Sequence, residues 1–183
     1  MAVALIIVIG VLVVGGAIVF GYYARKRRIQ EWQQTAGHLG FQYSTEDPFD
    51  LLGLPFDLFR RGDGRGVENV VWGQRDGLDI KDFEYWYYQH SSDAQGHTNL
   101  DYSHVSCTVV PTAVSQFATY LVDARMMQWL LDNKGWHFEL CGRWVLAYGG
   151  RTKPKLIWGV IEAAREFHQH IPKVIDETYR EGS

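Results

Sequence analysis

The strongest pattern in the sequence is an apolar run at its beginning, residues 2–23, which contains no charged residue and no proline. As an α-helix, these 22 residues would be about 33 Å long, enough to cross a hydrocarbon core of ~30 Å. A cleavable signal peptide would carry its positive charges before the run and small residues after it. Here Phe20, Tyr22 and Tyr23 close the run and the charges follow, so we predict a retained transmembrane anchor, residues 1–23.

Four consecutive cations follow the apolar run, and we call them the basic collar: Arg25, Lys26, Arg27 and Arg28. Positive charge is retained on the cytoplasmic side of a span, so the collar predicts an outside amino terminus and a cytoplasmic carboxyl-terminal domain. The collar would then lie at the membrane surface, and the lipid bilayer is the first expected partner. The preferred interpretation is that the collar only sets the orientation of the protein in the membrane. The alternative is that it binds anionic lipid headgroups and so regulates the protein.

Beyond the collar, apolar residues recur at helical spacing. This spacing predicts a basic juxtamembrane helix over residues 24–40, and Gly40 is a suitable residue to end it. The apolar face of this helix is formed by Ile29, Trp32, Ala36 and Leu39.

The remaining pattern is that of one cytoplasmic α+β domain, residues 41–175, followed by a polar tail at 176–183. Aromatic and β-branched runs between turn residues predict two hairpins and a third strand, and two longer stretches have helical periodicity. Strands are expected at residues 69–73, 78–89, 105–110, 136–140 and 144–148, and helices at 115–133 and 153–170. We therefore expect an antiparallel sheet of about five or six strands with two covering helices. A change of apolar register within residues 78–89 predicts a β-bulge near Lys81 and Asp82.

Charge and cysteine content narrow the possible functions. The chain has 18 basic and 21 acidic residues, and setting the collar aside leaves 14 against 21, a difference of −7. An acidic domain of this kind is a poor candidate for nucleic-acid binding. Cys107 and Cys141 form no CxxC motif, and we expect both to be reduced in the cytoplasm. No cofactor site is predicted.

The residues with the best potential for chemistry lie in a polar connection, residues 90–104, expected between the second and third strands. Imidazole and carboxylate groups at this density could bind a metal ion. Their spacing matches neither a helix nor a strand, however, so a solvated hairpin loop is the preferred interpretation. A glycine-rich stretch at residues 60–66 lacks the following helix and Lys-Ser/Thr ending of a phosphate-binding loop. Catalytic residues therefore remain unknown. The candidate metal ligands are His90, Asp93, His97, Asp101 and His104.

Several short motifs resemble those of an uncharacterised bacterial family of single-pass membrane proteins with a cytoplasmic α+β domain. They are residues 123–131 (DARMMQWLL) with 136–140, together with residues 39–43, 64–73 and 83–85. Members of that family carry an additional stretch between the third strand and the DARMM helix, which this chain lacks. The resemblance implies a topology and a fold, and it implies no catalytic or ligand residues.

These observations predict a single-pass membrane protein whose cytoplasmic domain serves interaction or scaffolding, with a protein partner on the cytoplasmic side. The alternative is a membrane-tethered hydrolase or metal-dependent enzyme that uses the residues 90–104. The oligomeric state stays open.

Overall fold

The computed structural model describes residues 2–92, 98–112 and 124–171; the side chains of residues 2–9, 11, 124 and 125 lie outside the described part. Its elements are α1 (Ala2–Leu39), β1 (Gln42–Ser44), the 3₁₀ turns η1 (Leu51–Gly53) and η2 (Leu58–Arg60), β2 (Gly64–Arg75), β3 (Leu78–Ser92), β4 (Thr98–Pro111), α2 (Ala124–Asp132), β5 (His137–Cys141), β6 (Trp144–Gly150), η4 (Pro154–Leu156) and α3 (Ile157–His170).

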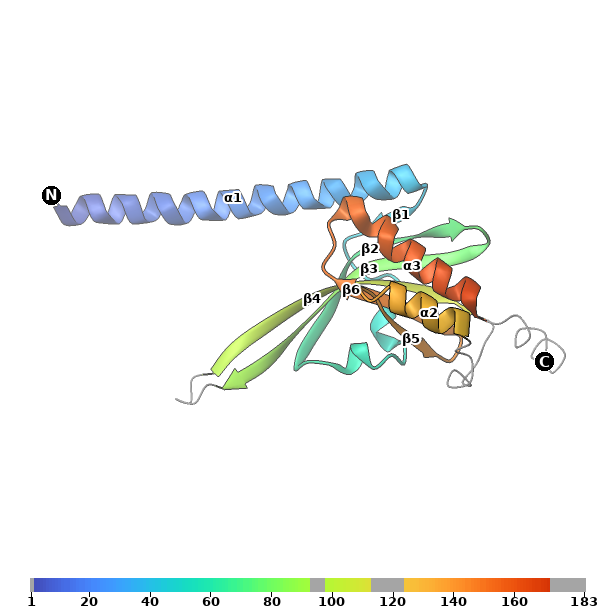
Figure 1. Cartoon of the computed structure of the whole chain (residues 1–183). Helices are drawn as coiled ribbons and strands as arrows, with labels where there is room; N and C mark the ends of the chain where they lie inside the picture. The colour runs from blue at the N-terminus through green and yellow to red at the C-terminus, as the bar shows by residue number, and fades with distance from the viewer. Residues whose placement is uncertain (1, 93–97, 113–123, 172–183) are drawn as a thin grey trace.

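The six strands form one antiparallel sheet in the order β1-β2-β3-β4-β6-β5. This confirms the α+β class and the antiparallel sheet. Asp76 and Gly77 connect β2 to β3 with positive φ angles of 51° and 78°, the turn geometry that matches the twist of paired strands. The strands β3 and β4 extend beyond their neighbours as a two-stranded arm, because β2 pairs with β3 only as far as Tyr88 and β6 pairs with β4 only from Val105 (Figure 1).

Helix α1 is continuous over 38 residues, and its two halves have different surroundings. Its amino half projects away from the domain, while its carboxyl half lies against the sheet and α3 (Figure 1). There Trp32 and Ala36 are 0% and 1% exposed. Among the residues whose side chains the structure describes, which leave out 2–9 and 11 of α1, no helix combines the length and the apolar character needed to cross a membrane.

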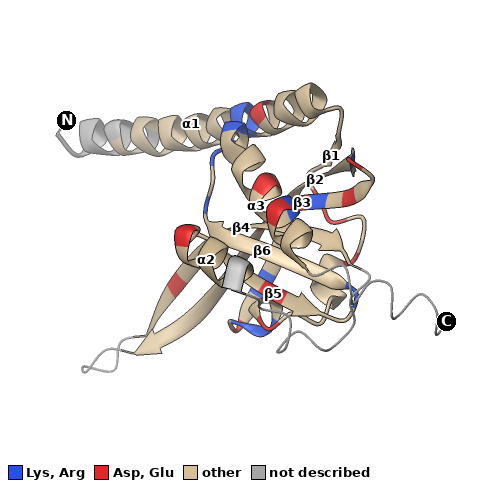
Figure 2. Ribbon diagram, turned by 45° about the vertical axis from the view of Figure 1, so that its right-hand side comes forward, with Lys and Arg blue, Asp and Glu red and all other residues tan. Residues whose placement is uncertain are grey.

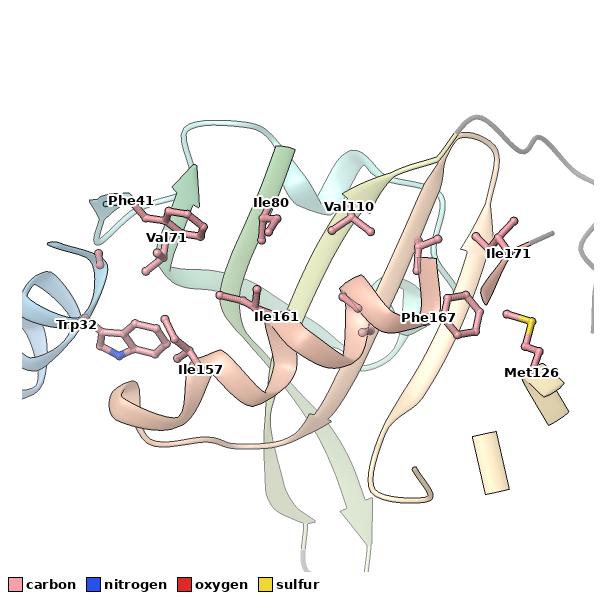
Figure 3. Packing of buried hydrophobic residues seen from close by; sticks show 14 residues of the cluster. Trp32, Phe41, Val71, Ile80, Val110, Met126, Ile157, Ile161, Phe167 and Ile171 are labelled. Atoms are coloured by element: carbon pink, nitrogen blue, oxygen red, sulfur yellow. The ribbon is translucent and has the colours of Figure 1, made fainter. Parts of the chain in front are cut away.

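One face of the sheet is covered by helices. Trp32 of α1 packs with Ile157 and Ile161 of α3 against Val71 and Ile80 of the sheet, and Met126 of α2 closes the far end of the same cluster (Figure 3). The prediction of two covering helices is therefore incomplete, because the carboxyl half of α1 is a third.

The opposite face is covered by the irregular segment around η1 and η2. Phe56 and Phe59 from this segment pack on Phe83 and Tyr85 of β3, with Phe59 ring centroids 5.9 and 5.3 Å from these two. This aromatic cluster lies entirely on the other side of the sheet from the helices.

Three sequence predictions need correction. The β-bulge is on β2, between Glu68 and Val71, which pair with Glu84 and Asp82; it lies opposite the predicted position and not within β3 itself. Residues 90–104 are not a polar connection, since β3 runs to Ser92 and β4 starts at Thr98.

The third correction concerns the helices. The final helix, predicted over residues 153–170, starts as the 3₁₀ turn η4, and α3 itself begins at Ile157. The predicted helix 115–133 falls partly outside the described residues, and its described part is α2.

Candidate functional site

Strand β3 places two carboxylates on the helix-covered face of the sheet. Ile80, Asp82 and Glu84 alternate along the strand, so all three point to the same side. Asp82 and Glu84 are both 0% exposed. Burying an ionised carboxylate is unfavourable unless it is paired and hydrogen-bonded, so the surroundings of these two groups define a specific site.

Glu84 is the centre of a polar network that joins α1 to the sheet. Its Oε1 accepts hydrogen bonds from Arg28 Nη2 on α1 and from Arg151 Nε, the latter at 3.0 Å. Its Oε2 accepts one from Asn69 Nδ2 at 2.7 Å. The Asn69 side chain in turn accepts a hydrogen bond from the Tyr43 hydroxyl at 2.7 Å. One buried carboxylate thus connects α1, β1, β2 and the segment after β6.

The bulge in β2 makes this network possible. Asn69 is the extra residue, and its φ of 54° is a left-handed conformation that asparagine adopts more readily than most residues. Val70 and Val71 pack on opposite faces of the sheet. The bulge therefore directs the Asn69 amide toward Glu84 while both valines stay in the core.

Burial and nearby acids perturb the tyrosine of this network. Burial, followed by the charges of Glu84 and Glu68, raises the pKa of Tyr43 to about 12, and Arg28 opposes the shift. Tyr43 therefore stays a hydrogen-bond donor at physiological pH and keeps Asn69 oriented.

Asp82 has far fewer partners than Glu84. Thr108 Oγ1 donates to its Oδ1 at 2.6 Å, and its Oδ2 has no hydrogen-bond partner among the described atoms. Burial raises the pKa of Asp82 well above its ordinary value, the Thr108 hydrogen bond lowers it in part, and the charge of Glu84 raises it further. The two carboxylates of β3 are therefore held in different ways.

A pocket of about 340 Å³ opens beside the network, where α1 leaves the domain. Figure 2 shows the basic segment of α1 at this point, above the sheet. The pocket is lined by three arginines and three polar residues, together with apolar residues of α1; the six polar lining residues are Arg25, Arg28, Thr45, Glu68, Asn69 and Arg151.

The four residues of the basic collar have different environments. Arg28 points inward to Glu84, and Arg25 lines the pocket. Arg27 pairs with Glu31 one turn further along α1, at 3.2 Å. Lys26 is exposed and does not line the pocket. Only half of the collar therefore contributes to the site.

The described metal-ligand candidates do not converge. His90 and Asp101 lie on adjacent strands, but Asp101 is opposite Gln89, so the two side chains point to opposite faces of the arm. His104 lies four residues beyond Leu100, the register partner of His90, a separation of about 13 Å along the strand.

The His90 ring instead contacts Asp63. Its Nδ1 lies 2.8 Å from Asp63 Oδ2, and the backbone and ring hydrogen bonds of His90 lower the pKa of that carboxyl. Asp93 and His97 lie outside the described residues. Across residues 2–92, 98–112 and 124–171, no group of three or more His, Cys, Asp or Glu side chains is placed to hold a metal ion.

Sequence reasoning missed the centre of this site. The predicted bulge near Lys81 and Asp82 interrupts the strand there, although Ile80, Asp82, Glu84 and Trp86 continue one uninterrupted alternation. That alternation was the available signal, because it places both carboxylates on the face of Ile80. Nothing local to Arg151 or Asn69 indicated that they would meet Glu84, since they are 67 and 15 residues away from it.

No protein-family model matches the chain, and the searches of curated proteins and of solved structures give no match either. The resemblance described from the sequence therefore rests on its short motifs, and the site is interpreted from its own geometry.

Proposed function

We propose that the protein is a single-pass membrane protein that holds an interaction domain in a fixed orientation at the cytoplasmic surface of the membrane. Residues 2–23 would span the bilayer with the amino terminus outside, and the basic collar would lie at the inner surface. The role of the domain is interaction or scaffolding with a protein partner.

The observation that carries the proposal is the contrast between the halves of α1. Leu12, Ile18 and Phe20 are 68%, 67% and 76% exposed, and every described residue from 12 to 27 is exposed. Soluble proteins rarely expose an apolar surface of this extent. The same helix buries Trp32 and Ala36 in the domain core. A bilayer around the exposed half would remove its apolar side chains from water, at about 25 cal/mol per Å².

The connection between anchor and domain supports a fixed orientation. Helix α1 runs without interruption from the apolar half into the core, so no flexible linker separates them. Arg28 fixes the rotation of the helix by bonding to the buried Glu84. Turning α1 about its axis would leave that carboxylate without one of its two cations, which is strongly unfavourable.

The arm offers a surface for a partner. Its strand β4 has an open outer edge from Thr98 to His104, because among the described strands β6 pairs with it only from Val105 onward. Leu100 and Tyr102 on this strand are 51% and 61% exposed. Open strand edges accept an added strand from another protein. The arm projects to the same side of the domain as the amino end of α1 (Figures 1 and 2), so the partner would also be close to the membrane.

The anchor is tested by a pair of charge substitutions in the full-length protein. The double variant Val13→Asp/Ile18→Asp adds two charges near mid-span, each unfavourable by about 2.5–3.5 kcal/mol for insertion. We expect wild type to stay with membranes after alkaline carbonate extraction and the variant to be released. Leu100→Asp, an equivalent change on the arm, is the control and should stay with membranes. Release of the wild type, or digestion of its domain by external protease in intact cells, would refute the proposal.

The interaction role is tested separately by proximity labelling from a carboxyl-terminal tag. Leu100→Asp and Tyr102→Asp should remove specific neighbours from the labelled set while leaving the membrane fraction unchanged. Glu46→Lys, on an exposed loop remote from the arm, is the matched control. An identical set of neighbours for all three variants would contradict a partner on the arm.

A further inference from the structure

The pocket beside Glu84 has an excess of positive charge that the domain does not neutralise. Arg28 and Arg151 share a single oxygen of Glu84, and Arg151 has a second, longer contact of 3.9 Å with Glu68. Arg25 makes no hydrogen bond or ion pair with the described residues. Three guanidinium groups therefore face two carboxylates, one of which is buried beneath them.

Unused donors in the pocket indicate an anionic ligand with several oxygens. Arg28 Nε lies beneath the pocket, closed off from solvent, and has no acceptor among the described atoms, so Glu84 uses the Arg28 guanidinium only in part. Arg25 is exposed at the pocket wall, and its guanidinium N–H groups make no hydrogen bond with the described residues. Guanidinium groups bind phosphate through two parallel hydrogen bonds, and a phosphate offers enough oxygens for two such groups at once.

The position of the pocket identifies the source of the phosphate. Its first lining residue is Ala24, directly after the last residue of the proposed span. If α1 is inserted up to Tyr23, the pocket mouth lies at the level of the lipid headgroups. Lipid phosphates are present there at high local concentration, and the cytoplasmic leaflet is rich in anionic lipid.

We infer that this pocket is a specific site for the phosphate of one anionic phospholipid, with Arg25, Arg28 and Arg151 as its ligands. The inference rests on the proposed membrane anchoring and adds a site to it. Arg28 and Arg151 are positioned by Glu84, and Arg25 closes over the phosphate from α1. Bound lipid would connect the bilayer to the same carboxylate that fixes the orientation of the domain.

The collar provides matched variants to test this. Arg25 and Lys26 are adjacent, exposed and equally charged, but only Arg25 lines the pocket. Full-length protein in neutral detergent would be titrated with phosphatidylglycerol or phosphatidylcholine, and the first bound lipid measured by native mass spectrometry. Arg25→Ala should weaken phosphatidylglycerol binding about tenfold or more. Lys26→Ala should weaken it at most about fivefold, the effect of a general surface charge.

Further measurements in the same experiment define the ligand. Arg25→Lys keeps the positive charge but removes the planar guanidinium group and its parallel N–H donors. It should therefore weaken binding by more than Lys26→Ala does. Phosphatidylcholine should bind less tightly than phosphatidylglycerol and respond little to either variant. Inorganic phosphate should not compete at concentrations comparable to the lipid.

Three results would overturn the inference: equal losses for Arg25→Ala and Lys26→Ala, no retained phosphatidylglycerol on wild type, or full competition by inorganic phosphate, which would indicate a soluble anion. A failure of the proposed anchoring is distinguishable, because it appears as release of wild type by carbonate. Arg25 is exposed, so its variants should melt at the wild-type temperature.

Discussion

The two faces of the sheet are buried in different ways. On one face Phe59, Phe83 and Tyr85 form an aromatic cluster that the chain closes with its own irregular segment. On the other face Asp82 and Glu84 are buried among apolar residues, and Glu84 bonds to Arg28 of the docked helix α1. The aromatic face contributes burial without much directional preference, whereas the polar face requires particular partners at particular positions.

This difference matters because the polar face is where α1 joins the domain. A buried ion pair seldom adds net stability compared with an apolar pair of similar volume, but a broken one is strongly unfavourable. Arg28 and Glu84 therefore select one orientation of the helix more than they strengthen its attachment. For a domain held by a single membrane helix, that selection sets which surface faces a partner.

The largest effect should come from breaking the polar face. The double variant Arg28→Ala/Arg151→Ala leaves Glu84 buried with Asn69 as its remaining partner. We expect a loss of about 3–5 kcal/mol in the free energy of unfolding, the usual result of leaving one buried charge unpaired. Denaturant unfolding in detergent micelles, followed by tryptophan fluorescence, measures it.

Adding Glu84→Gln to that double variant is the control. It removes the unpaired charge and keeps an acceptor for Asn69, so it should recover at least half of the lost stability. If the triple variant is no more stable than the double, the arginines act by packing alone and the comparison between the faces fails.

The aromatic face should respond to lost volume and not to charge. Leu146→Ala, at a fully buried position of that cluster, should cost about 2–4 kcal/mol through lost burial and a residual cavity. The loss should be the same at low and high salt and across pH 5–8, measured by the same unfolding assay. A marked salt or pH dependence would show that the two faces are energetically coupled.

Sequence alone predicted the strands and the class of fold better than the contacts of the polar face. The hairpins and the class of fold follow from alternating runs and turn residues such as Asp76-Gly77, which are local signals. The polar network depends on residues far apart in the chain, such as Arg28 and Arg151 meeting Glu84, and no local pattern encodes that meeting. Acidic residues at core positions also contradict the expectation that a buried face is apolar, so their alternation was misassigned.

A smaller effect is expected at the hydrogen bond between the two central strands. Thr108→Val keeps the shape of the side chain and removes the only described donor to Asp82. Leaving that carboxyl without a partner should reduce stability by about 1–3 kcal/mol. Thr108→Ser, which keeps the hydroxyl, should retain most of the stability in the same denaturant assay. Equal losses for the valine and serine variants would assign the effect to packing.

The smallest and most informative change is Asp82→Asn, which tests whether the second carboxylate of the polar face opposes folding. The pKa of Asp82 is raised in the folded protein, whereas in the unfolded chain it should be ~3.9. Between these values the folded state binds more protons than the unfolded state, so stability falls as pH rises from ~4 through the folded pKa. Asparagine keeps an acceptor for Thr108 and has no such titration.

The variant should therefore melt at a higher temperature than wild type near pH 8, with the difference shrinking toward zero as the pH approaches ~4. Thermal melts of both proteins across this range in one detergent measure the difference directly and cancel the titration of shared groups. Glu84→Gln is the contrasting variant, since it removes the charge that Arg28 and Arg151 bond, and it should lower the melting temperature near neutral pH. A constant difference for Asp82→Asn, or one of the opposite sign, would mean that Asp82 is stabilised as a carboxylate and that the two acids of β3 are equivalent.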